Sequence, residues 1–209
     1  MKVRPRILVA IAAILGLVSV SALAAAFILI TWEPPLPPPT TSGTADIGGP
    51  FTLVSTRGDT VTDQTFHGKW LVLFFGYTYC PDVCPTTLNN ISLALEGLGA
   101  DASKLQPAFV TVDPKRDTRD VLTEYLKSFD PRIIGLTGTQ AQIDHMVKEY
   151  HVYAAPQKSE NGDNDYLVAH SAYIYLMDPK GKFMNVIQGT ESGQEIAAWL
   201  RKETARSKL

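Results

Sequence analysis

The sequence has little positive charge outside its first six residues. Lys2, Arg4 and Arg6 are three of its 19 basic side chains, so 16 basic side chains remain against 21 acidic ones, a formal net charge of −5 for the rest of the chain. A domain with that balance lacks the basic surface that binds nucleic-acid phosphates. We therefore expect no nucleic-acid partner.

Charge is missing altogether between Ile7 and Ile30. An apolar run of that length can cross a bilayer as one helix. The basic residues before it predict, by the positive-inside rule, a cytoplasmic N-terminus and an extracytoplasmic domain. Signal-peptide cleavage near the small residues at 22–26 is the alternative, but the apolar run continues past that site. We expect residues 1–32 to be an uncleaved, single-pass anchor.

Only two cysteines are present, Cys80 and Cys84, in the stretch YTYCPDVCP. Outside the cytoplasm they could form a disulfide. A disulfide that encloses only three residues removes little entropy from the unfolded chain and stabilises a fold weakly. A structural staple is therefore the weakest of three interpretations. The other two are a redox pair and a metal-binding pair.

The rest of the chain reads as one α/β domain behind a proline-rich segment. Residues 33–48 are rich in Pro, Thr and Gly and are expected to form an extended linker, which leaves 49–209 as the folded domain. Continuous apolar runs predict buried strands, and apolar side chains at three- and four-residue spacing predict helices. A hairpin of 166–178 with 182–189 is expected before the last helix. The expected strands are 71–77, 107–113 and 133–138, and the expected helices are 85–99, 118–129, 139–152 and 193–209.

The cysteine pair follows the strand 71–77 at the start of a helix, which is the arrangement of the thioredoxin-like fold, a central mixed sheet flanked by helices. The N–H groups at a helix N-terminus favour thiolates. Disulfide exchange and metal binding both need a thiolate, so the location does not separate them. Dithiol oxidoreductases of this fold usually have two residues between the cysteines, and this chain has three. Two thiolates favour Cu(I) or Zn and leave at least one coordination position to be filled.

The four histidines are candidates for a further ligand. His67, His145 and His151 are expected in a turn, on a charged helix face and at a helix end, where solvent exposure explains them. His170 differs, because period-two counting places it on one strand face with Val168 and other apolar residues. A lone histidine on an apolar face is usually a satisfied core residue, but a long polar loop precedes this one, as expected of a flap over a site. From these observations alone its role stays open.

Four stretches together resemble the SCO/SenC family, membrane-anchored copper proteins for assembly of cytochrome c oxidase. They are LFFGYTYCPDVCPTTL, FVTVDPKRDT, IIGLTGT and DYLVAHSAYIYLMDPKGKF. The resemblance covers about residues 47–190 together with the anchor architecture. The combination is far more specific than the cysteine pair alone, and it implies a thioredoxin-like domain.

The resemblance implies a copper site. One copper ion per chain, chiefly Cu(I) with Cu(II) as a second state, would be bound by Cys80, Cys84 and His170. Oxidation of the two cysteines to a redox disulfide would destroy that ligand set. The implied function is that of a metallochaperone rather than an enzyme. It delivers copper to the copper-receiving subunit of cytochrome c oxidase, and an upstream copper donor is a further partner. The domain would face the bacterial periplasm or its equivalent, the mitochondrial intermembrane space.

Two alternatives use the same fold. A thiol–disulfide oxidoreductase that reduces the cysteines of the oxidase subunit would need both sulfurs but not His170. A thiol peroxidase would have the fold as well, but the sequence has no single-cysteine signature of that class.

The chain departs from the family pattern at one position. The family commonly has an acidic residue just before the histidine, where this chain has Ala169. This removes an expected carboxylate beside the site but leaves the ligand set intact. Asp113, Pro114, Arg116 and Asp117 match the family's loop after the second central strand. They either shape and charge the rim of the site or form a turn and a helix cap.

Overall fold

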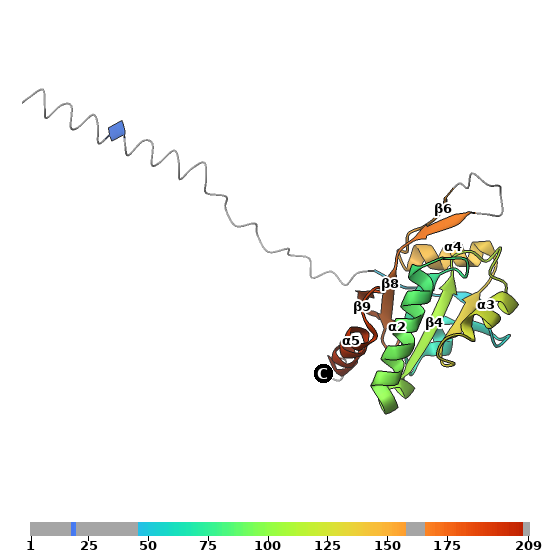
Figure 1. The fold of residues 1–209 in the computed structure, drawn as a ribbon, viewed down its shortest axis with the longest axis horizontal. Helices are drawn as coiled ribbons and strands as arrows, with labels where there is room; N and C mark the ends of the chain where they lie inside the picture. The colour runs from blue at the N-terminus through green and yellow to red at the C-terminus, as the bar shows by residue number, and fades with distance from the viewer. Residues whose placement is uncertain (1–17, 20–45, 158–165, 207–209) are drawn as a thin grey trace, which may run out of the picture. The chain divides into compact units, whose positions relative to one another are not determined.

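The computed structural model describes residues 18–19, 46–157 and 166–206. The chain divides into two compact units, Met1–Thr44 and Ala45–Leu209, and the second contains the sheet and helices (Figure 1). The expected anchor lies outside the described residues except for Val18 and Ser19, which have helical backbone. Within the described ranges, no helix is both long and apolar enough to cross a bilayer.

The packed unit begins slightly earlier than the expected boundary at residue 49. The N–H of Gly48 donates to the carbonyl oxygen of Glu149 over 2.8 Å, and Ile47 packs against the core. Gly48 has φ of +99°, and a Cβ there would lie 2.7 Å from Cε of Met177. Residues 46–48 are therefore part of the folded domain rather than the linker, and residues 33–45 lie outside the described part of the chain.

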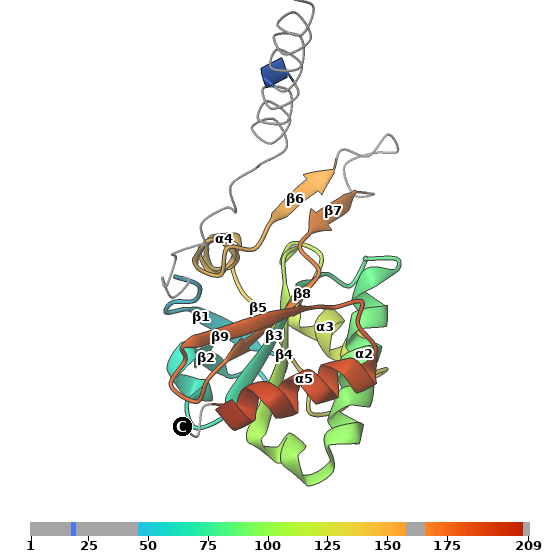
Figure 2. The same ribbon diagram turned by 90° about the vertical axis from the view of Figure 1, so that its left-hand side faces the viewer.

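The core of the domain is a seven-stranded mixed sheet with the order β2-β1-β5-β4-β3-β8-β9 (Figure 2). β3, β4 and β5 run parallel, whereas β8 and β9 continue the sheet antiparallel on one side and β1 and β2 on the other. All seven residues of β3 are buried, as its continuous apolar run predicts. The strands are β1 (Thr52–Ser55), β2 (Thr60–Thr62), β3 (Trp70–Gly76), β4 (Leu105–Thr111), β5 (Ile134–Thr137), β6 (Ala154–Gln157), β7 (Leu167–His170), β8 (Tyr173–Met177) and β9 (Phe183–Gln188).

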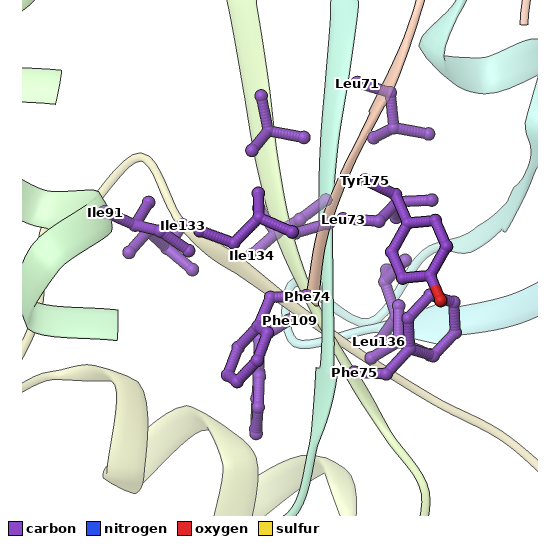
Figure 3. Close-up of a cluster of buried hydrophobic side chains, with 14 of the residues drawn as sticks. Leu71, Leu73, Phe74, Phe75, Ile91, Phe109, Ile133, Ile134, Leu136 and Tyr175 are labelled. Carbon is purple, nitrogen blue, oxygen red and sulfur yellow. The ribbon is translucent and has the colours of Figure 1, made fainter. Parts of the chain in front are cut away.

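Helices cover the sheet, so the predicted mixed sheet flanked by helices is confirmed. Figure 3 shows Phe74 and Phe109 on one face of the sheet and Phe75 and Tyr175 on the other. α2 and α3 pack on the first face and the end of α4 on the second. α5 packs along α2. The helices are α2 (Val83–Leu98), α3 (Arg119–Leu126), α4 (Gln140–Glu149) and α5 (Gly193–Arg206), and the two short 3-10 helices are η1 (Asp63–Phe66) and η2 (Gly99–Lys104).

The region before the last hairpin differs from its prediction. A single strand over 166–178 is wrong, because β7 leaves the main sheet and pairs with β6 instead. The N–H of Ser171 donates to the carbonyl oxygen of Tyr153 over 2.9 Å, and the main sheet resumes only at Tyr173. Figure 2 shows the β6–β7 pair projecting beyond the main sheet. The predicted pairing of β8 with β9 is confirmed.

One apolar side chain of α3 faces solvent. Val121 is 38% exposed, while Leu122 and Leu126 face the core. The helix is only eight residues long, so its buried face is narrow.

Candidate metal centre

The two cysteines lie at the junction between the central strand β3 and the helix α2 that follows it. β3 ends at Gly76 and α2 begins at Val83, so Cys80 is in the connecting loop and Cys84 is in the first helical turn. Cys84 is fully buried, whereas Cys80 keeps 9% of its surface exposed. Cys80 is therefore the sulfur that a partner molecule can meet first.

Gly76 makes the room that the Cys84 sulfur occupies. A Cβ at position 76 would lie 2.7 Å from Cys84 Sγ and 2.7 Å from Cε2 of Phe109. Close packing of the interior allows neither contact. A glycine inside an apolar run is the sequence signal for such a close approach, but the pattern did not indicate which side chain approaches.

His170 reaches the cysteines from β7, 86 positions along the chain from Cys84. The ligand atoms of Cys80, Cys84 and His170 all lie within 4.8 Å of one another. Cys84 Sγ is 3.3 Å from His170 Nε2. The structure thus brings together all three residues that the sequence singled out. Among the described residues, no other group of three His, Cys, Asp or Glu side chains has this geometry.

The hydrogen bonds of His170 define which ring nitrogen is free. Nδ1 lies 3.2 Å from the carbonyl oxygen of Ser171. A carbonyl oxygen only accepts, so this contact assigns the proton to Nδ1 and leaves the lone pair of Nε2 facing Cys84. In that tautomer Nε2 can accept the S–H of Cys84 or bind a metal ion, and the bond from Nδ1 orients the ring.

Two aromatic rings at the end of β3 flank the imidazole. Tyr77 and Phe74 meet the His170 ring edge-on, with centroids 5.8 Å and 6.3 Å away. The hydroxyl of Tyr77 also accepts a hydrogen bond from the N–H of Val168 over 3.1 Å. The sequence did not assign either aromatic residue to the site. The available signal was a tyrosine with a polar hydroxyl at the end of the apolar run LFFGY.

The two thiols differ in acidity. A hydrogen bond from Cys84 lowers the pKa of Cys80, and the backbone N–H groups of Asp82 and Cys84 lower it further, while burial opposes them. The same hydrogen bond, followed by burial, raises the pKa of Cys84. The sulfurs therefore share one proton, and Cys80 is the first to become a thiolate.

The remaining histidines take no part in this cluster. His67 is exposed. Nε2 of His145 contacts the carbonyl oxygen of Pro50 at 3.0 Å, and Nε2 of His151 contacts that of Asp46 at 2.9 Å. His151 has φ of +51°, so it follows α4 in a left-handed conformation. Each of the three has an ordinary surface environment, as predicted.

Asp117 ties the cysteine loop to the neighbouring strand. Its buried carboxylate accepts hydrogen bonds from the N–H and hydroxyl of Thr78, at 3.0 Å and 2.6 Å, and from the hydroxyl of Thr111 at 2.7 Å. Burial raises the pKa of Asp117, and these bonds oppose the shift. The next residue, Thr118, caps α3 by accepting from Val121 N–H. The end of the loop after β4, at Asp117, therefore fits the interpretation as a turn and helix cap.

Arg116 ties the same loop to the chain that leads into β7. It forms an ion pair with Asp113, and its Nη1 donates to the carbonyl oxygen of Tyr166 over 2.9 Å. Its guanidinium carbon lies 3.7 Å from the ring centroid of Tyr166 and 4.7 Å from that of Tyr79. The hydroxyl of Tyr166 donates to Asp113 over 2.8 Å. Asp113 and Arg116 therefore connect the chain before Cys80 with the chain before β7, and their role at the rim of the site stays a prediction.

Comparison with known proteins gives this geometry a family. Residues 39–205 match the family described as SCO1/SenC. The chain is 40% identical over 170 residues to Protein SCO2, mitochondrial, of Saccharomyces cerevisiae, an alignment that covers 77% of this chain and 56% of that relative. It is 37% identical over 154 residues to Protein SCO1 homolog, mitochondrial, of Homo sapiens, covering 73% and 51% respectively. The chain thus spans about half the length of these relatives.

Solved structures agree with the sequence comparison. The structure of Bradyrhizobium japonicum ScoI with copper bound has a TM-score of 0.70 and 44% identity, covering 75% of this chain and 99% of that one. Arabidopsis thaliana ScoI with copper bound has a TM-score of 0.72 and 37% identity, covering 77% and 99%. Because the family match spans most of the chain and the fold is shared, this chain belongs to the SCO1/SenC family.

Proposed function

We propose that this protein binds copper through Cys80, Cys84 and His170 and delivers it to the copper centre of cytochrome c oxidase during assembly. The observation that carries the proposal is the convergence of two sulfurs and one imidazole nitrogen within 4.8 Å. Copper as the cargo is supported by the copper-bound structures of two proteins 44% and 37% identical to this chain. Delivery to the oxidase rests on the resemblance to the SCO/SenC family.

The separations suit one small, soft ion. Bonds from zinc to sulfur and to imidazole nitrogen are about 2.3 Å and 2.0 Å, so three ligands in a plane around an ion of similar size lie about 3.5–4.0 Å apart. The 3.3 Å between Cys84 Sγ and His170 Nε2 and the 4.8 Å limit for the whole set bracket that spacing. Two thiolates and an imidazole suit Cu(I). Structural zinc takes four protein ligands, and the cluster offers three among the described residues.

The same geometry supports release of the ion. A three-coordinate ion can accept a further ligand, and Cys80 is the less buried of the two cysteines. A ligand of the recipient subunit can bind there and replace the donor's ligands one at a time. Exchange of the two thiols with a disulfide transfers two electrons and two protons and joins Cys80 to Cys84, which removes two ligands. Copper binding then depends on redox state.

A second function is favoured by the unequal thiols. Cys80 has a lowered pKa and partial exposure, which suit attack on a disulfide in a partner protein. Cys84 is close enough to resolve the mixed disulfide that results. This chemistry would reduce the cysteines of the oxidase subunit, and it requires both sulfurs but not His170.

The substitution His170→Ala separates the two functions. It removes one of three ligands, so Cu(I) affinity should fall by at least about 100-fold, the upper end of the loss from removing an outer hydrogen-bond partner of a ligand. Disulfide exchange should change little. Competition titration with Cu(I) under reducing conditions measures the first quantity and exchange with a model disulfide the second. His67→Ala, which removes an exposed imidazole, is the matched control. Normal assembly of the oxidase copper centre in cells with His170→Ala at limiting copper would contradict delivery and leave the reductase function in its place.

We also propose that residues 1–32 anchor the protein in the membrane and that 33–45 link the anchor to the domain. The charge-free run from Ile7 to Ile30 and its basic N-terminal flank support this. The domain then faces the bacterial periplasm or the mitochondrial intermembrane space, where an upstream copper donor and the oxidase subunit can both reach it. N-terminal sequencing of the mature protein tests retention, and a start near Phe27 would show a cleaved signal instead.

A further inference from the structure

His170, the proposed third ligand, belongs to β7, a strand that is not part of the main sheet. His170 ends β7, which pairs only with β6 in a two-stranded sheet outside the main sheet. An isolated two-stranded hairpin is marginally stable in water. The position of the imidazole relative to the sulfurs therefore depends on contacts between β7 and the rest of the domain.

Tyr77 contacts both halves of the site. Its carbonyl oxygen accepts a hydrogen bond from the N–H of Cys80 over 3.2 Å. Its hydroxyl accepts from the N–H of Val168 over 3.1 Å, and its ring lies edge-on to His170. The side chain is only 2% exposed, so water does not compete readily for these contacts. A single residue thus links the cysteine loop to the strand that carries the histidine.

We propose that Tyr77, through its hydroxyl, is a positioning residue that sets the distance between His170 and the two sulfurs. The inference rests on the proposed copper site. Val168 and His170 are two positions apart and so lie on the same face of β7. Holding the N–H of Val168 fixes the register of the strand, because a slip of one residue would move the chain by about 3.3 Å and turn the imidazole away.

Other hydrogen bonds also hold the chain around β7. They lie further from the imidazole or connect the chain to a different part of the domain. Arg116 holds the carbonyl oxygen of Tyr166, four positions before His170. Ser171 bonds to Tyr153, which leads into β6 and not into the cysteine loop. Apart from the contact between His170 and Cys84, the hydroxyl of Tyr77 makes the hydrogen bond that joins β7 directly to the residue after β3. Tyr77→Phe deletes that oxygen and keeps the ring.

The test compares Tyr77→Phe with Tyr175→Phe in the full-length protein. Tyr175 is also buried, but its ring packs on Phe75, on the face of the sheet opposite Phe74 and Phe109 (Figure 3). Tyr77→Phe should lower Cu(I) affinity about three- to tenfold, which corresponds to the net contribution of one hydrogen bond, and Tyr175→Phe should change it less than about twofold. In the metal-free, reduced protein, amide hydrogen exchange at Val168 should accelerate about three- to tenfold in Tyr77→Phe only.

A second pair of variants identifies the route of the effect. If Tyr77 acts through His170, then Tyr77→Phe should cause no further loss of Cu(I) affinity in the His170→Ala background. Equal losses in Tyr77→Phe and Tyr175→Phe, a loss that persists without His170, or unchanged exchange at Val168 would each overturn the inference. Failure of the wild-type protein to bind copper through His170 would instead refute the proposed function. The exchange measurement, made without metal, distinguishes the two failures.

Discussion

The two halves of the site are built very differently. The cysteines follow β3, whose seven residues are all buried at the centre of the main sheet, and the imidazole comes from β7, where Leu167 is 49% exposed. One half is fixed by dense packing, and the other is held by a few polar contacts. This difference teaches that thiol chemistry and metal coordination can be altered separately, because they depend on elements of unequal stability.

The largest effect should come from disturbing the fixed half with Gly76→Ala. The new Cβ would lie 2.7 Å from both Cys84 Sγ and Cε2 of Phe109, and both side chains are fully buried. We expect a loss of about 3 kcal/mol in the free energy of unfolding, the upper part of the range for overpacking a core. Urea unfolding measures it. Gly97→Ala is the control, because its Cβ would meet nothing nearer than 3.9 Å and helical alanine is favourable. Equal stability of the two variants would show that the cysteine half is not tightly packed.

A smaller and more local effect is expected from Arg116→Lys, which should weaken the attachment of β7, the strand that carries His170. Lysine keeps the charge beside Asp113. It cannot at the same time replace the hydrogen bond that a second guanidinium nitrogen donates to the carbonyl oxygen of Tyr166. A hydrogen bond from a charged group contributes about 1.5–3 kcal/mol, so amide exchange in β7 should accelerate by roughly tenfold or more.

Native-state hydrogen exchange of Arg116→Lys measures this effect strand by strand. The amides of β3 should keep their protection, while those of β7 should exchange faster. Arg119→Lys is the matched control, since Arg119 pairs with Asp120 on the exposed surface. Equal acceleration in β3 and β7 would mean that the two halves unfold together and that the contrast between them is wrong.

The smallest expected effect is on the rate at which the two cysteines are alkylated. Because the pKa of Cys80 is lowered to about 4 in the folded protein, its thiolate should persist as the pH falls from 8 to 6, where an ordinary cysteine loses most of its thiolate. Because a weaker base is a weaker nucleophile, the absolute rate exceeds that of an ordinary cysteine only near pH 6, by about a few-fold, and falls below it at pH 7–8. Alkylation of the reduced, metal-free protein at several pH values, mapped by mass spectrometry, measures this. Cys80 should react first with a flat profile, and a rate that falls tenfold per pH unit in this range would contradict it.

The central part of the fold could be predicted from local pattern. The run LFFGY and the helical spacing after the cysteines specify β3 and α2, because both elements are defined by side chains close together in sequence. The break between β7 and β8 could not be predicted. Ser171 and Ala172 carry no glycine or proline signal, and the apolar residues on both sides read as one strand.

The site was predictable only in part. Period-two counting singled out His170 but could not decide between a ligand and a core residue, and the family resemblance was needed to choose. The partnerships of Tyr77 with Val168 and of Arg116 with Tyr166 span 91 and 50 positions. A sequence window contains no information on such pairs, since they arise only when the sheet and the β6–β7 pair are assembled.

The 86 positions between Cys84 and His170 also determine when the site can exist. During synthesis the N-terminal part of a chain emerges first, so both thiols are present well before the imidazole. Contacts between residues this distant in sequence carry a large loop-closure entropy and form late in folding. A growing or partly folded chain therefore presents a bare dithiol, which is open to oxidation and can offer a metal ion only two ligands. In the proposed site, binding by three ligands therefore requires the finished fold, whereas binding by the two thiols alone does not.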